Sequence, residues 1–113
     1  MRHRVVITGL SAVSPLGTDL ATSWKGLVAG ESGIGPITRF DCSEYETRFA
    51  GEVTGFNPED FIPKKQARRL DRFTQFTVAC AKMLLADAGW EIYQRAAEQW
   101  EADTGVTLDQ VDI

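Results

Sequence analysis

The sequence is poor in the residues that supply metal-binding and nucleophilic chemistry. Its 113 residues include one histidine and two cysteines, Cys42 and Cys80, and no CxxC pair. One histidine and two separated cysteines do not make a metal site, so we predict no bound metal. Two cysteines without a pairing pattern also favour a reduced, cytoplasmic protein over a disulfide-bonded secreted one.

Long apolar runs are also missing. No stretch is long and apolar enough to span a bilayer, so we expect no membrane association. The basic start followed by Val5, Val6 and Ile7 has some features of a secretion signal. Thr8 and Gly9 interrupt the apolar run, and no small-residue cleavage pattern follows it, which argues against secretion.

Phosphate-binding motifs are incomplete. Thr8-Gly9 follows an apolar run, as the first glycine of a dinucleotide-binding turn would. Ser11 and Ser14 occupy the later glycine positions of G-x-G-x-x-G, and G-x-x-x-x-G-K-[ST] does not occur. The sequence therefore predicts no nucleotide cofactor, and we expect none of another kind.

The charge is unevenly distributed along a chain of formal net charge −4. Residues 1–62 carry five basic and eight acidic side chains, and residues 73–113 carry two basic and seven acidic. Between them, residues 63–72 carry five basic and one acidic, for a local charge of +4. An acidic chain with one basic block is a poor general nucleic-acid binder, but the block can attract a compact acidic partner.

Hydrophobic periodicity predicts a strand and then helices. Residues 4–9 are short, β-branched and apolar, as a buried strand would be, and residues 9–17 predict a loop. Thr18 or Asp19 can cap a helix that ends at Gly30. Its apolar face comprises Leu20, Trp24, Leu27 and Val28.

Further along, residues 31–36 predict a Gly-rich loop and residues 47–53 a weak edge strand. Asn57-Pro58 is a helix-start signature. The longest predicted helix runs from about 64 to 88 and ends at Gly89, and a second follows over 91–101. The long helix carries an apolar stripe of Leu70, Phe73, Thr77, Cys80, Ala81, Leu84 and Ala88.

One strand followed by helices indicates part of a layered α/β fold. A single early strand needs sheet neighbours, and this chain offers only weak candidates for them. The pattern therefore already predicts an α/β fold whose sheet is incomplete in this chain.

Four segments, in this order, resemble the start of the type II, elongating β-ketoacyl-acyl-carrier-protein synthases. They are RVVITGL (4–10) with SPLG (14–17), TSWKGLVAGESGI (22–34), RFD (39–41) with FAG (49–51), and RRLDRF (68–73) with ADAG (86–89). The resemblance covers residues 1–90, predicted to be the N-terminal segment of a synthase domain. We expect residues 91–113 to form a divergent helical tail.

The resemblance implies the N-terminal portion of a thiolase-like, layered αβαβα fold, in an enzyme class that forms homodimers. It implies 3-oxoacyl-acyl-carrier-protein synthase activity, the decarboxylative condensation of acyl and malonyl groups in fatty acid biosynthesis. That chemistry uses one cysteine thiolate and two histidines. We predict no catalytic residue in this chain, and an N-terminal fragment that is inactive alone, because His3 is its only histidine.

Neither cysteine fits the nucleophile's role. Cys80 lies in the middle of the predicted long helix, on its apolar stripe, which favours a core thiol. Cys42 lies in a polar turn with no identifiable histidine partner.

The basic block offers the candidate binding site. The resemblance implies that Lys65, Arg68 and Arg69 help to dock the acidic acyl carrier protein. Three- and four-residue spacing from Lys65 places them on one helix face. The simpler interpretation is a solvated helix face. At the level of function, the alternative is a non-catalytic module that binds acyl carrier protein or a full-length synthase.

Overall fold

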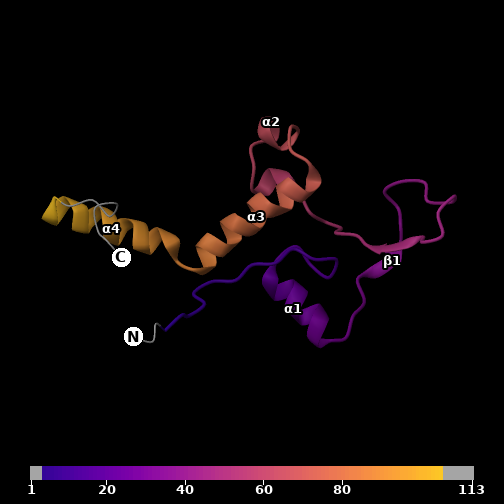
Figure 1. Ribbon diagram of the computed structural model, residues 1–113, viewed down its shortest axis with the longest axis horizontal. Helices are drawn as coiled ribbons and strands as arrows, with labels where there is room; N and C mark the ends of the chain where they lie inside the picture. The colour runs from indigo at the N-terminus through magenta and orange to yellow at the C-terminus, as the bar shows by residue number, and fades with distance from the viewer. Residues whose placement is uncertain (1–3, 106–113) are drawn as a thin grey trace.

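The computed structural model describes residues 4–105, which form an elongated chain of helices and one short hairpin (Figure 1). The radius of gyration is 19.8 Å, whereas a compact domain of this length has about 13 Å. The elements, in chain order, are α1 (Leu20–Val28), β1 (Ile34–Pro36), β2 (Phe49–Gly51), the 3₁₀ turn η1 (Pro58–Asp60), α2 (Lys64–Ala67), α3 (Arg72–Asp87) and α4 (Trp90–Thr104).

The buried core is small and lies where η1 and α2 pack near the start of α3. Among the described residues the buried apolar side chains are Phe56, Ile62, Ala67 and Ala79. Phe56 packs edge-on against Phe76 of α3, with ring centroids 4.9 Å apart. This cluster holds the segment from residue 56 to residue 70 against α3.

The predicted strand over residues 4–9 was wrong, because these residues form no strand in the structure. Val5 is 91% exposed and Ile7 is 80% exposed. A strand is stable only when neighbouring strands pair with it, and the described residues supply none beside this segment. The apolar side chains of residues 4–9 therefore stay exposed, because no sheet in the described residues covers them.

The N-terminal segment instead lies against the end of α3 (Figure 1). The Leu10 N–H donates a 2.8 Å hydrogen bond to Oδ2 of Asp87. A Cβ placed on Gly9 would lie 2.7 Å from Cβ of Ala88, closer than such atoms approach. Glycine at position 9 is thus required for this contact, which joins two segments far apart in the sequence.

The predicted helix start at Asp19 is confirmed. Oδ1 of Asp19 accepts a 2.8 Å hydrogen bond from the Thr22 N–H, and Oδ2 accepts one from the Thr22 hydroxyl. These bonds hold the pKa of the Asp19 carboxyl below its usual value. Gly30 follows the helix with φ of 71°, a conformation that favours glycine. The apolar face of α1 is uncovered, and Trp24 is 62% exposed.

The region predicted as a Gly-rich loop over 31–36 contains β1, which corrects that prediction. β1 pairs antiparallel with β2, inside the predicted edge strand, and Ile34 lies opposite Gly51. Pro15, in the loop before α1, packs against this hairpin at two glycines. A Cβ at Gly33 would lie 2.6 Å from Cβ of Pro15, and a Cβ at Gly51 would lie 2.8 Å from Cγ of Pro15. Two small residues thus let the proline ring approach the hairpin.

The single helix predicted over 64–88 is two helices, α2 and α3, separated at residues 68–71. Asp71 has an extended backbone, with φ −64° and ψ 155°. The side-chain amide of Gln75 donates to the carbonyl oxygens of Ala67, at 2.9 Å, and Leu70, at 3.2 Å. Gln75 thereby satisfies backbone carbonyls that a continuous helix would have bonded internally.

The predicted buried stripe of the long helix was also displaced. Phe73 is 71% exposed, whereas Ala79 is fully buried. The face turned inward carries Arg72, Phe76 and Ala79, because Phe56 and η1 pack on that side. Gly89, with φ of 66°, separates α3 from α4 as predicted. Residues 106–113 of the predicted tail lie outside the described residues.

Gly9→Ala should loosen the N-terminal segment, because the new Cβ collides with Ala88. Overpacking costs roughly 1–3 kcal/mol, so the Leu10 amide should exchange its hydrogen about tenfold faster. Amide hydrogen exchange followed by NMR measures this. Gly35→Ala is the control, since nothing lies within 4 Å of its added Cβ. Unchanged exchange at Leu10 in Gly9→Ala would contradict the contact.

Candidate functional site

The five basic side chains of residues 63–72 divide into two groups in the structure. Lys65, Arg68 and Arg69 are exposed, and within residues 4–105 their side chains make no ion pair. Lys64 and Arg72 are engaged by neighbouring side chains or backbone. The predicted docking residues are therefore the three cations that remain available to a partner. We call these three side chains the basic surface.

Local backbone geometry places the basic surface on one side of the chain. The Arg68 N–H donates to the Lys64 carbonyl at 3.2 Å, and the Arg69 N–H donates to the Gln66 carbonyl at 2.9 Å. The helical winding of α2 therefore continues past its end at Ala67. On this turn Ala67 is buried, whereas Lys65, Arg68 and Arg69 are exposed. The structure thus brings the predicted trio together.

Arg72 belongs to the interior rather than to the basic surface. Its guanidinium lies 5.0 Å from the centre of the Phe76 ring and 5.6 Å from that of Phe56. Nη2 also donates to the Val53 carbonyl at 3.3 Å. Partial burial, with the nearby charge of Arg39, lowers the pKa of Arg72. Arg72 therefore fixes the start of α3 to the segment that precedes η1.

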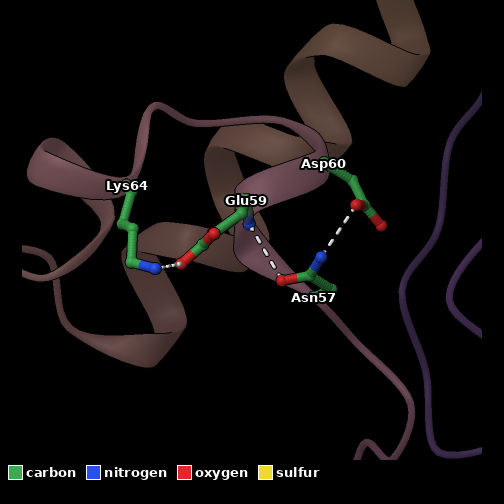
Figure 2. Close-up of polar contacts among 4 residues, drawn as sticks. All are labelled: Asn57, Glu59, Asp60 and Lys64. Carbon is green, nitrogen blue, oxygen red and sulfur yellow. Dashed lines mark hydrogen bonds and ion pairs between the residues drawn. The ribbon is translucent and has the colours of Figure 1, made fainter.

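Lys64 is paired with an acid from the preceding turn. Its Nζ lies 3.7 Å from Oε1 of Glu59 in η1 (Figure 2). Both side chains remain largely open to solvent. This pair was not predicted from the sequence, because Glu59 and Lys64 are five residues apart and lie in different elements.

Contacts from α3 and from the residues before α2 hold the segment that carries the basic surface. Gln75 bonds the carbonyls at the end of α2, and Ile62 is buried just before that helix begins. Phe61 stacks on Phe56, and its carbonyl accepts a hydrogen bond from Nζ of Lys82 in α3. Backbone and side-chain contacts thus hold residues 61–70 in place.

His3 lies outside residues 4–105, so the described part of the chain contains two cysteines and no histidine. Cys80 is half-buried in α3, one residue beyond the fully buried Ala79. Cys42 lies in a turn, where its carbonyl accepts from the Tyr45 N–H.

An open hollow of about 630 Å³ lies between the N-terminal segment, α1 and α3. The sequence did not predict it, because its lining comes from three segments that are far apart in the chain. Both carboxylates on its wall are already bonded, Asp19 to Thr22 and Asp87 to Leu10. The rest of its lining is mostly apolar and comprises Leu10, Ser11, Leu20, Ala21, Trp24 and Met83.

Comparison with known proteins identifies the class. The family model described as beta-ketoacyl synthase, N-terminal domain, matches residues 2–110. The 3-oxoacyl-acyl-carrier-protein synthase 2 of Staphylococcus aureus (strain COL) is 46% identical over 96 residues, covering 85% of this chain and 23% of that protein. The enzyme of the same name from Synechocystis sp. (strain ATCC 27184 / PCC 6803 / Kazusa) is 44% identical over 98 residues, covering 87% of this chain and 24% of that protein.

A solved structure, the ishigamide ketosynthase/chain length factor, is also similar. It superposes with a TM-score of 0.68 at 39% identity, covering 79% of this chain and 22% of that one. This confirms the expected fold class, the N-terminal portion of a thiolase-like layered α/β fold.

The chain belongs to the β-ketoacyl synthase family, through the N-terminal domain of that family. It spans less than a quarter of the length of the curated relatives it matches. The family match extends beyond residue 90. The division that we expect there, into a synthase segment and a divergent tail, stays a prediction.

We expect a protein of these 113 residues to be inactive in condensation, because one histidine cannot supply the two that the family chemistry uses. The assay is carbon–carbon bond formation from acyl- and malonyl-carrier protein, with Cys80→Ser and Cys42→Ser as paired variants. Turnover that Cys80→Ser abolishes and Cys42→Ser preserves would contradict this expectation and make Cys80 the nucleophile.

Proposed function

We propose that this chain is the N-terminal part of a 3-oxoacyl-acyl-carrier-protein synthase and provides a docking surface for acyl carrier protein. The observation that carries the proposal is the basic surface, three unpaired cations on one firmly supported turn. The names of the similar proteins, which specify an acyl-carrier-protein synthase, support the choice of partner.

In the proposed role, these residues deliver the substrate and take no part in bond making. The complete synthase would join a carrier-bound acyl chain to malonyl-carrier protein with loss of carbon dioxide. Cys80 is half-buried in the middle of α3, a position that suits a core thiol rather than a nucleophile. The contribution of the basic surface is to hold the acidic carrier close to the enzyme.

The physics of the basic surface suits a carrier that must bind and leave. Exposed cations attract an acidic partner over about 10 Å at 0.1 M salt and speed its encounter. Each exposed ion pair contributes at most about 1 kcal/mol, so the complex should be weak. A weak, salt-sensitive complex matches a partner that shuttles acyl groups between enzymes.

A second proposal, favoured by the uncovered apolar side chains, is that the chain binds a full-length synthase. Val5, Trp24 and Leu27 are each more than half exposed, and large apolar patches mark interaction surfaces.

Within the part of the chain that the structure describes, no helix is both long and apolar enough to cross a membrane. We place the protein in the cytoplasm and propose a homodimer for the complete enzyme, as the family resemblance implies.

Reversing two charges of the basic surface should weaken carrier binding. Lys65→Glu/Arg69→Glu replaces two attractive pairs with repulsive ones, so we expect about a tenfold loss of affinity at low salt. The loss should shrink as salt rises. Binding of an acyl carrier protein, measured by calorimetry at low and moderate salt, tests this.

The matched control is Lys25→Glu/Arg95→Glu, which makes the same change in net charge at exposed positions on α1 and α4. It should alter carrier affinity far less. Equal binding by both double variants, or binding indifferent to salt, would reject the basic surface as the docking site and leave a solvated helix face.

A further inference from the structure

Glu59 is the acidic residue that the structure places against the basic block. Its carboxylate lies 3.7 Å from Nζ of Lys64, and the two side chains are 47% and 62% exposed, respectively. Figure 2 shows the two side chains reaching toward each other across the gap between η1 and α2. The pair removes one cation from a block of five before any partner arrives.

Asn57 sets the direction of this acid and of its neighbour. Oδ1 of Asn57 accepts a 3.2 Å hydrogen bond from the Glu59 N–H, and its Nδ2 donates a 2.8 Å bond to Oδ1 of Asp60. The two consecutive acids are thereby separated, Glu59 toward Lys64 and Asp60 toward Asn57 (Figure 2). Only one of the two acids competes for the lysine.

The position of Glu59 is held by the fold as well as by its own contacts. η1 packs against α2, and Ile62, between them, is buried. Glu59 therefore stands at the border of the basic surface, where its negative charge opposes an acidic partner. An acidic group of a partner that binds Lys64 therefore competes with the Glu59 carboxylate.

We propose that Glu59 limits how tightly an acidic carrier protein binds, because its carboxylate pairs with Lys64 and masks the charge of that lysine. The proposal rests on the carrier-docking function proposed above. With the charge of Lys64 partly neutralised by Glu59, the carrier meets three unpaired cations and one paired cation, and the Glu59 carboxylate repels its acidic groups. Removing the mask should increase affinity rather than reduce it.

The test compares two neutralised acids that are adjacent in sequence. Glu59→Gln releases Lys64 and should tighten binding of an acyl carrier protein about two- to fivefold at low salt, the range that one exposed pair supports. Asp60→Asn removes the same charge one residue away, keeps an acceptor for Asn57 and leaves the Lys64–Glu59 pair intact. It should change affinity by less than about 1.5-fold.

A double-mutant cycle then separates masking from a general charge effect. In a Lys64→Gln background, the gain from Glu59→Gln should fall to the level of Asp60→Asn. A remote control, Glu91→Gln, removes an acid from the exposed pair with Arg95 on α4 and should have little effect.

The outcomes distinguish failure of the masking proposal from failure of the docking function. If the wild type binds with salt dependence but Glu59→Gln matches Asp60→Asn, or keeps its gain without Lys64, the masking proposal is overturned while docking stands. If the wild type shows no salt-dependent binding at all, the docking function fails, and the masking proposal fails with it.

Discussion

The support of the basic surface depends on the contact of Arg72 with two phenylalanine rings. Its guanidinium faces Phe56 and Phe76 and bonds the Val53 carbonyl, so a single side chain ties the start of α3 to the segment before η1. Contacts of a cation with aromatic rings contribute about 0.5–2 kcal/mol. One turn later, Gln75 bonds the end of α2 to the same helix. The basic surface is held in place by these two neighbouring residues of α3.

The five cations of residues 63–72 have different roles because their surroundings differ. Arg72 stabilises the fold, Lys64 is paired with Glu59, and the remaining cations face solvent. A block that looks uniform in the sequence is divided by the side chains around it. An acidic partner meets unpaired cations most readily, so we expect the proposed docking surface to bind weakly and to respond to the one nearby acid, Glu59.

Away from the anchor, the chain leaves much apolar surface uncovered. Val5 and Ile7 have no strand beside them, and the apolar faces of α1 and of α3 near Phe73 meet solvent. The elongated shape follows, because burial drives compaction only where partner surfaces exist. The curated relatives have more than three quarters of their length outside the matched region.

Local features could be predicted from the sequence, and non-local ones could not. The cap at Asp19 and the glycine break at Gly89 depend on neighbouring residues, and both were predicted correctly. The strand over 4–9 was wrong because a strand needs partners from elsewhere. The break between α2 and α3 was missed because it depends on Gln75 reaching back to residues five and eight positions earlier.

The candidate site shows the same division. That Lys65, Arg68 and Arg69 share one helix face follows from their spacing, as the sequence predicts, and the structure shows all three exposed. The burial of Arg72 depends on Phe56, sixteen positions earlier, and the pairing of Lys64 depends on the placement of η1. Neither has a signal in the local pattern of charges.

Mapping where a carrier protein contacts the chain tests most directly whether the basic surface is the docking site. Titrating unlabelled acyl carrier protein into the ¹⁵N-labelled chain should shift amide signals chiefly between Glu59 and Arg72, with the shifts reversed by added salt. Shifts concentrated on the exposed apolar face of α1, around Trp24 and Leu27, with none in residues 59–72, would contradict the claim that the basic surface is the docking site.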